Sequence, residues 1–140
     1  MKPFEYLEGI TDADYAFKAY GKNLNELFVN SAMALNSAMV KSESVGETVV
    51  KEIVLENDVV EKLLFEFLEE IIFLKDAESL MMNSVKVEIS GTYKLKAVFY
   101  GEELNLDKHE VVTDVKSVTY HHYKVEKVND HWEATFVVDV

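Results

Sequence analysis

The sequence predicts an α+β domain in which two amphipathic helices pack on a largely antiparallel or mixed β-sheet. Only two segments repeat apolar residues at the helical period, and the other regular segments alternate or are rich in β-branched residues. Predicted hairpins dominate the second half of the chain, which favours antiparallel pairing. With 140 residues and 49% hydrophobic content, residues 1–140 are expected to form a single compact domain.

The first half of the chain opens with two short strands and a helix. Residues 4–7 and 15–20 are predicted to be strands. Asn23 is a favourable N-cap, and Glu26 follows it at the spacing of a capping box. Apolar residues then recur at helical spacing, which predicts an amphipathic helix over residues 24–40.

A strand and a second helix follow. Residues 47–56 are rich in β-branched side chains and favour a strand, after which Asn57 or Asp58 is expected to cap a helix. The apolar face of that helix comprises Val60, Leu63, Leu64, Phe67, Leu68, Ile71 and Leu74. Glutamates lie mostly on the other face, so the pattern indicates packing against a sheet rather than a ligand-binding stripe.

The second half is predicted to contain strands over residues 85–89, 93–100, 115–128 and 132–139. Gly91 lies in the turn between the first two of these strands, and Asn129-Asp130 forms the turn between the last two. Residues 101–114 are polar and are expected to be irregular. Both predicted helices therefore belong to the first half of the chain.

Charge and composition exclude several classes of function. The 14 basic residues, all lysine, face 26 acidic ones, and the net charge of −12 argues against direct nucleic-acid binding. A role in RNA metabolism would therefore act through a protein partner with a basic surface, although acidity can also serve solubility alone. The chain has no cysteine, no signal-peptide pattern and no membrane-length apolar run, which favours a cytoplasmic protein without membrane contact.

Recognised catalytic motifs are absent from the sequence, so enzymatic activity is not expected. The histidines offer little to a metal ion either. His121 and His122 are adjacent on a predicted strand and should point to opposite faces, which would prevent them from sharing one metal. His131 lies at a hairpin turn, so a zinc site is not expected.

Acidic residues near the two ends of the chain suggest a site for a hard cation. Asp12 and Asp14 would present carboxylates on one side of an extended segment, and Asp139 stands beside the α-carboxylate of Val140. If the terminal strand lay next to the strand over residues 12–20, three or four anionic oxygens could converge, and a cation would offset their repulsion. The alternative is that the carboxylates simply face water.

Three stretches carry a family resemblance. The most specific runs from Tyr100 to Glu110 (YGEELNLDKHE) and continues over residues 114–121 (DVKSVTYH). A second covers residues 8–21, and the third is the closing Val-Asp-Val of residues 138–140. Together these stretches resemble the archease family, whose members read YGE.L.L.KH, EVKAITYH, EHTADVGI..YG and a closing Asp-Ile. The resemblance covers essentially the whole chain.

The resemblance implies a function and a metal site. Archeases activate RtcB-type tRNA-splicing RNA ligases by promoting guanylylation of the ligase and multiple turnover, and are not themselves enzymes. Their divalent cation, commonly calcium, is held by an entrance Asp, a penultimate Asp and the terminal carboxylate, which correspond here to Asp14, Asp139 and Val140. The seven-residue spacing to Gly21 selects Asp14. The family's entrance histidine is missing, and Asp12 stands where threonine is usual, as an additional or alternative ligand.

The same resemblance indicates residues that contact the partner or a nucleotide. Lys116 lies in the EVKAITY block and could contact a phosphate or pair with the acidic cluster, the alternative being an ordinary solvated lysine. Lys108 and His109 follow Glu102 in the polar loop, where partner contacts tend to lie, and a structural hydrogen bond is the alternative role for His109. An acidic activator and a basic ligase would meet faster than neutral partners.

Two other functions remain open on the sequence. One is a metal-dependent phosphate-ester hydrolase with Asp14 and Asp139 as ligands and His109 as base. The other is a general chaperone or protein-binding module. Neither accounts for the pattern of residues 100–121.

Overall fold

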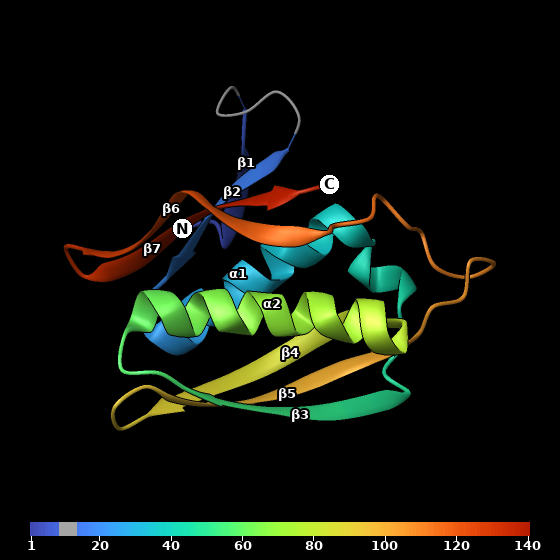
Figure 1. Cartoon of the computed structure of the whole chain (residues 1–140), viewed down its shortest axis with the longest axis horizontal. Coiled ribbons are helices and arrows are strands. Elements are labelled where there is room, and N and C mark those ends of the chain that lie inside the picture. The colour runs from blue at the N-terminus through green and yellow to red at the C-terminus, as the bar shows by residue number, and fades with distance from the viewer. Residues whose placement is uncertain (9–13) are drawn as a thin grey trace.

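The computed structural model describes residues 1–8 and 14–140, and in it two antiparallel sheets enclose a layer of helices (Figure 1). One sheet has the strand order β1 (Phe4–Leu7), β2 (Tyr15–Gly21), β7 (His131–Asp139) and β6 (Ser117–Val128). The other has the order β3 (Val49–Glu56), β5 (Lys94–Glu103) and β4 (Leu80–Ser90). The helices are α1 (Leu24–Met39) and α2 (Val60–Glu78), with a short 3-10 helix, η1 (Ser42–Ser44), after α1.

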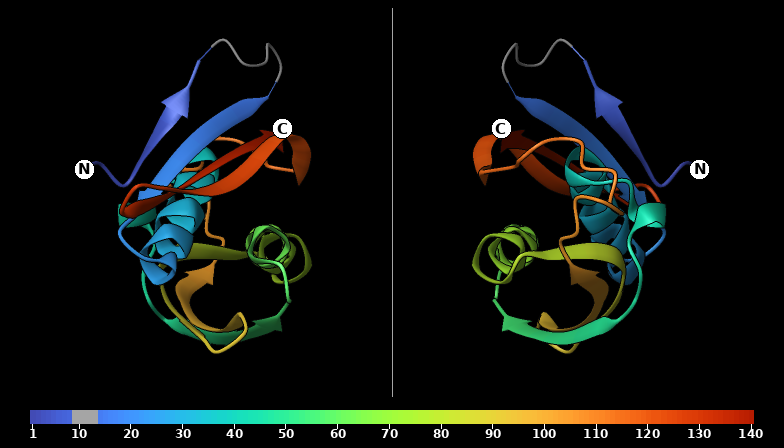
Figure 2. Two further views of the ribbon diagram at one scale, coloured as in Figure 1. Left: turned by 90° about the vertical axis from the view of Figure 1, so that its left-hand side faces the viewer. Right: turned by 90° about the vertical axis from the view of Figure 1, so that its right-hand side faces the viewer.

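Both helices lie between the sheets, as the two side views in Figure 2 make clear. α1 packs against β2 and β7 on one side and β4 on the other, while α2 packs against β6 on one side and β3 and β4 on the other. The predicted α+β class and the two helices are therefore confirmed, but the strands divide into two sheets instead of one. In the described part of the chain, neither helix has the length and apolar character needed to cross a bilayer.

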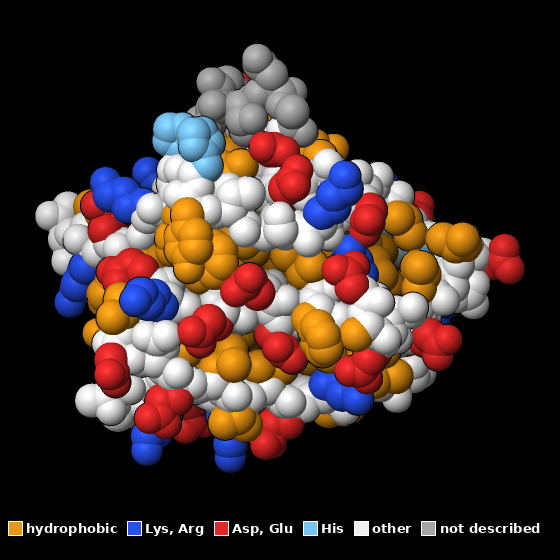
Figure 3. Space-filling model, in the orientation of Figure 1, with side chains coloured by type: hydrophobic (Ala, Val, Ile, Leu, Met, Phe, Trp, Pro, Cys, Tyr) orange, Lys and Arg blue, Asp and Glu red, His pale blue; other side chains and the backbone are white. Residues whose placement is uncertain are grey.

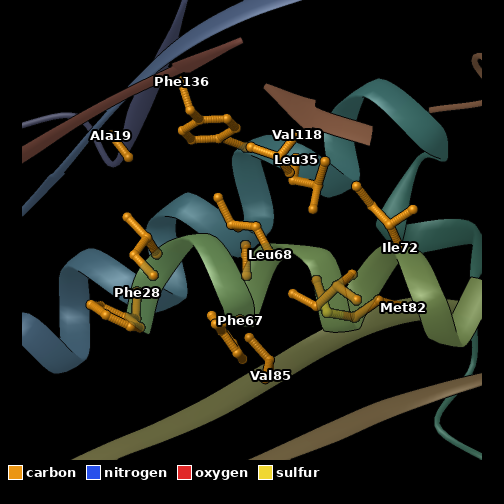
Figure 4. Packing of buried hydrophobic residues seen from close by; sticks show 14 of the residues in the cluster. Ala19, Phe28, Leu35, Phe67, Leu68, Ile72, Met82, Val85, Val118 and Phe136 are labelled. Atoms are coloured by element: carbon orange, nitrogen blue, oxygen red, sulfur yellow. The ribbon is translucent and has the colours of Figure 1, made fainter. Parts of the chain in front are cut away.

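Side chains on opposite sides of α2 explain the two sheets. Figure 4 shows Leu68 directed towards the sheet that contains Phe136, and Phe67 directed towards Val85 of the other sheet. Both α2 residues are fully buried, as is Phe136. Because apolar side chains cover more than one side of the helix, a sheet on each side is needed to remove them from water.

The two helices begin differently. The Asn23 side chain accepts a hydrogen bond from the backbone N–H of Glu26 at 2.9 Å, which confirms the predicted cap of α1. The cap predicted for α2 at Asn57 or Asp58 is wrong, because Val59 occupies that position and makes no side-chain cap. Asn57 instead accepts from the backbone N–H of Val59 at 2.9 Å, in a turn just before the helix.

The β4–β5 pair is longer than the alternation of the sequence indicated. β4 begins at Leu80 because three consecutive apolar residues there are buried, and a bulge between Met82 and Ser84 restores the alternation. β5 continues to Glu103, so the first three residues of the segment expected to be irregular belong to a strand. Gly101 permits this, since a Cβ at that position would lie 2.0 Å from the backbone oxygen of Met81.

Candidate metal and partner-binding site

β2 and β7 are neighbours in their sheet, so Asp14 and Asp139 adjoin the same end of this strand pair. Tyr15 pairs with Val138 in the antiparallel ladder, and Asp14 and Asp139 are the next residues beyond this last pair. Both aspartates are partly exposed, while Val138 is fully buried and holds the end of β7 in the core. The strand adjacency on which the sequence-based hypothesis depended is therefore present.

The segment that leads into β6 completes this end of the sheet. Ser117 pairs with Asp139, and the backbone N–H of Lys116 donates to the backbone oxygen of Asp139 at 2.8 Å. The Lys116 side chain is exposed and borders a hollow whose opposite wall includes Glu69 and Asp76 of α2. The ammonium group of Lys116 and the carboxylates of Glu69 and Asp76 thus share one region of the surface.

The described side chains do not by themselves form a metal site. Within residues 1–8 and 14–140, no three side chains of His, Cys, Asp and Glu gather where they could hold a metal ion. Asp12 lies outside the described residues. A cation bound between Asp14 and Asp139 would need a further ligand, and the α-carboxylate of Val140 is of the required chemical type, an anionic oxygen.

Glu102, Lys108 and His109 form one hydrogen-bond network that joins the end of β5 to the middle of the loop that follows it. The Oε1 atom of Glu102 lies 2.8 Å from Lys108 Nζ and 2.6 Å from His109 Nε2, and it accepts from the backbone N–H of Gly46 at 2.9 Å. The backbone N–H of Asn105 donates to His109 Nδ1 at 3.1 Å, so the ring proton resides on Nε2 and is donated to Glu102. The His109 side chain has no exposed surface.

These contacts stabilise the charged form of Glu102. The hydrogen bond from Lys108, followed by those from Gly46 and His109, lowers the pKa of Glu102 to about 2. The network joins the loop after β5 to the segment after η1, and therefore fixes the loop in place. Of the residues predicted to contact a partner, the structure brings these three together and leaves Lys116 apart, beside Asp139.

The histidine pair of β6 differs from the sequence-based prediction. His121 and His122 were expected on opposite faces, but their ring centroids lie 4.2 Å apart. His122 has a φ of 57°, and the ladder between β6 and β7 shifts register between residues 119 and 124. The bulge lets Tyr120 and Tyr123 both contact the ring of Phe65, at centroid distances of 4.0 and 5.3 Å.

A sequence signal for this bulge existed. Tyr120 and Tyr123 are three residues apart, so they would face opposite sides of a regular strand. Two large aromatic residues at that odd spacing favour an irregularity that directs both rings to one side.

Comparison with known proteins shows which family this chain belongs to. The model of the Archease protein family matches residues 4–140. The chain belongs to the archease family. It is 40% identical to the archease of Pyrococcus abyssi and 41% identical to that of Thermococcus kodakarensis, with 100% of each chain covered.

Two solved structures are similar in fold. The solution structure of protein 1598 from Methanobacterium thermoautotrophicum has a TM-score of 0.83 to this archease-family chain at 26% identity, with 100% of both chains covered. The crystal structure of an archease from Thermotoga maritima, described as a possible chaperone, has a TM-score of 0.66 at 21% identity over 93% of each chain, and shares the fold.

Proposed function

We propose that this protein is a non-catalytic activator of an RtcB-type tRNA-splicing RNA ligase, which promotes guanylylation of the ligase and multiple turnover. Membership of the archease family over residues 4–140 supports the proposal. The observation that carries it is the antiparallel pairing of β2 and β7, because Asp14 and Asp139 adjoin the same end of that strand pair. The family resemblance implies functional carboxylates at these two positions.

The residues at this end of the sheet fit a hard divalent cation such as calcium. Asp14, Asp139 and the α-carboxylate of Val140 would hold it, with Asp12 as an additional or alternative ligand, because all of them offer anionic oxygen atoms. When bound, such an ion neutralises phosphate charge. The aspartates bind and orient the cation in this proposal, and the adjacent Lys116 binds a phosphate oxygen or pairs with the acidic cluster.

The wider charge distribution suits docking on a basic protein. The net charge of −12 disfavours direct contact with RNA, and it favours encounter with a ligase whose active-site mouth is positively charged. The acidic end of the sheet would then approach the mouth of the ligase, where triphosphate and metal ions meet. Activation in this scheme requires a protein contact as well as the carboxylates.

The hydrolase alternative is disfavoured by the surroundings of His109. Its two ring nitrogens are engaged by Asn105 and Glu102, and its side chain has no exposed surface. A general base must reach the proton that it removes from water or substrate. His109 instead serves to hold the loop.

A chaperone function is the second candidate. The archease of Thermotoga maritima is described as a possible chaperone, and several large apolar side chains of the present protein are exposed. A chaperone of this kind would suppress aggregation of unrelated proteins, and its activity would not depend on Asp14.

The test is a guanylylation assay with the RNA ligase of the same organism, GTP and substoichiometric activator. The additions are none, the wild type, Asp14→Asn and the matched control Asp58→Asn, which makes the same chemical change at an exposed position. We expect strong stimulation by the wild type and the control, and its loss in Asp14→Asn. Absence of stimulation by the wild type would refute the proposed function and favour the chaperone, which an aggregation assay would then examine.

A further inference from the structure

Large exposed apolar side chains gather where the loop after β5 meets the C-terminal end of α2. In the loop these are Leu104, Leu106 and Val111, with exposed fractions of 39, 76 and 47%. On α2, Phe73 is 55% exposed. Single exposed apolar residues are ordinary, whereas a group of them on one surface marks a contact site.

A hollow runs through this surface. Met81, which is almost fully buried, lies at its base, and Leu104, Leu106 and Val111 line its sides in a space of ≈ 290 Å³. Asp76 borders this hollow and also a second one that is lined by Phe73, Lys116 and Ser117. Asp76 therefore links the hollow to the surface around Lys116 and Ser117, next to Asp139. We call the surface formed by residues 104–112 together with Phe73 and Asp76 the apolar ridge.

The main chain of the apolar ridge is held firmly at both ends of the loop. Leu104 donates its N–H to the backbone oxygen of Ser79 at 2.8 Å, and Val112 donates to the backbone oxygen of Met39 at 2.8 Å. The buried Glu102–His109 hydrogen bond fastens the middle of the loop. A loop fixed in this way keeps Leu106 in water instead of folding it onto the core, although its burial would be favourable.

Charge around the apolar ridge indicates what covers it. Exposed Asp107 and Glu110 lie within the loop, and Asp76 and Asp114 lie at the rim of the hollow. The nearby Lys75 pairs with both rim aspartates, and Lys108 pairs with Glu102, so these lysines do not leave a free positive charge. Towards the right of Figure 3, where this loop projects in Figure 1, apolar and acidic side chains are interspersed.

We propose that the apolar ridge is the surface on which a basic protein partner docks, with an apolar side chain of the partner in the hollow and its lysines or arginines on the acidic rim. The inference rests on the proposed function, in which that partner is the RNA ligase. Docking is thereby assigned to the ridge, and the action on the nucleotide site to Asp14 and Asp139. The two tasks are separable by substitution.

The experiment measures binding of the purified ligase to the immobilised full-length protein, together with guanylylation under the same conditions. The variants are Leu106→Ser, the conservative Leu106→Met, Asp14→Asn and the control Val54→Ser. Val54 is 65% exposed on β3 and pairs with Lys96 near the start of β5, whereas the ridge follows the end of β5, so the control makes a comparable loss of apolar surface away from the ridge. Circular dichroism melting verifies that each variant folds.

We expect Leu106→Ser to raise the dissociation constant for the ligase roughly tenfold, because it removes a central apolar contact. The dissociation constants of Leu106→Met and Val54→Ser should be close to that of the wild type. Stimulation by Leu106→Ser should recover at higher concentration. Asp14→Asn should fail to stimulate at any concentration, including those at which its binding is saturated. If the wild type stimulates the ligase and Leu106→Ser binds it as tightly as the wild type does, the proposed docking surface is refuted and the proposed function stands. Wild-type protein that neither binds nor stimulates would refute both.

Discussion

Replacement of Gly101 by alanine should be among the most damaging single-methyl changes in this protein. Gly101 lies in the central strand of its sheet, paired with Val49 on one side and Met82 on the other. A Cβ at this position would lie 2.0 Å from the backbone oxygen of Met81 and 2.8 Å from a ring carbon of Phe99. Ordinary contact begins at 3.4 Å, so the neighbouring strand would have to retreat by about 1.4 Å.

The cost follows from what has to move. Overpacking a well-packed site costs about 1–3 kcal/mol, and the upper end applies here because the obstacle is main chain in a hydrogen-bonded ladder. For a chain of this length, about 3 kcal/mol corresponds to a fall of roughly 10 °C in the midpoint of thermal unfolding. The displacement would also disturb the adjacent Glu102 and the loop that it holds.

Gly91→Ala is the matched control. Gly91 has a φ of 57°, and an alanine methyl group at this position would have no neighbouring heavy atom within 4 Å in the described residues. The substitution therefore costs only the left-handed backbone strain, about 1 kcal/mol. Thermal unfolding followed by circular dichroism compares the two variants. If Gly101→Ala melts no lower than Gly91→Ala, the close approach of β4 and β5 at this position is refuted.

Three further predictions concern the loop, the bulge and the charge. Because the pKa of Glu102 is about 2, below its ordinary 4.5, the carboxylate stabilises the folded protein above about pH 4.5, and this contribution is lost as the pH falls towards 2. Glu102→Gln should therefore lower the unfolding midpoint at neutral pH more than Glu103→Gln does, and equal midpoints at neutral pH would contradict the network. Tyr123→Phe removes a 2.5 Å hydrogen bond to the backbone oxygen of Glu61 and should cost about 1 kcal/mol in urea unfolding, whereas Tyr120→Phe, on an exposed ring, should cost almost nothing. Activation of the ligase should weaken as the salt concentration rises, because the Debye length shortens from roughly 30 Å at 0.01 M to about 8 Å at 0.15 M. Stimulation that does not change with salt concentration would exclude a charge-assisted encounter.

Local sequence was sufficient for the helices and most strands. The capping pair Asn23 and Glu26 marks the start of α1, and the helical spacing of apolar residues delimits both helices to within a few positions. The hairpin between β6 and β7 was predictable from its turn, because Asn129 adopts a φ of 56° that asparagine tolerates. These features depend on residues close together in the chain.

Only part of the candidate site could be predicted from the sequence. The predicted convergence of Asp14 and Asp139 depended on pairing between the terminal strand and the N-terminal strand, and β2 and β7 do pair. No sequence pattern indicated that the Glu102 carboxylate would accept hydrogen bonds from His109, Lys108 and the backbone of Gly46, since Gly46 is distant in sequence. The metal and partner assignments remain proposals to be tested.

The sequence by itself determined the α+β class, the two helices, the final hairpin and the acidic character. Only the tertiary structure decided that the strands form two sheets, that β6 bulges at His121 and His122, and that the loop after β5 displays Leu106 to water. The physical reason is that turns, caps and periodicity depend on neighbouring residues. Strand partners and exposed surfaces instead depend on how both sides of the helices are covered, which is a property of the whole core.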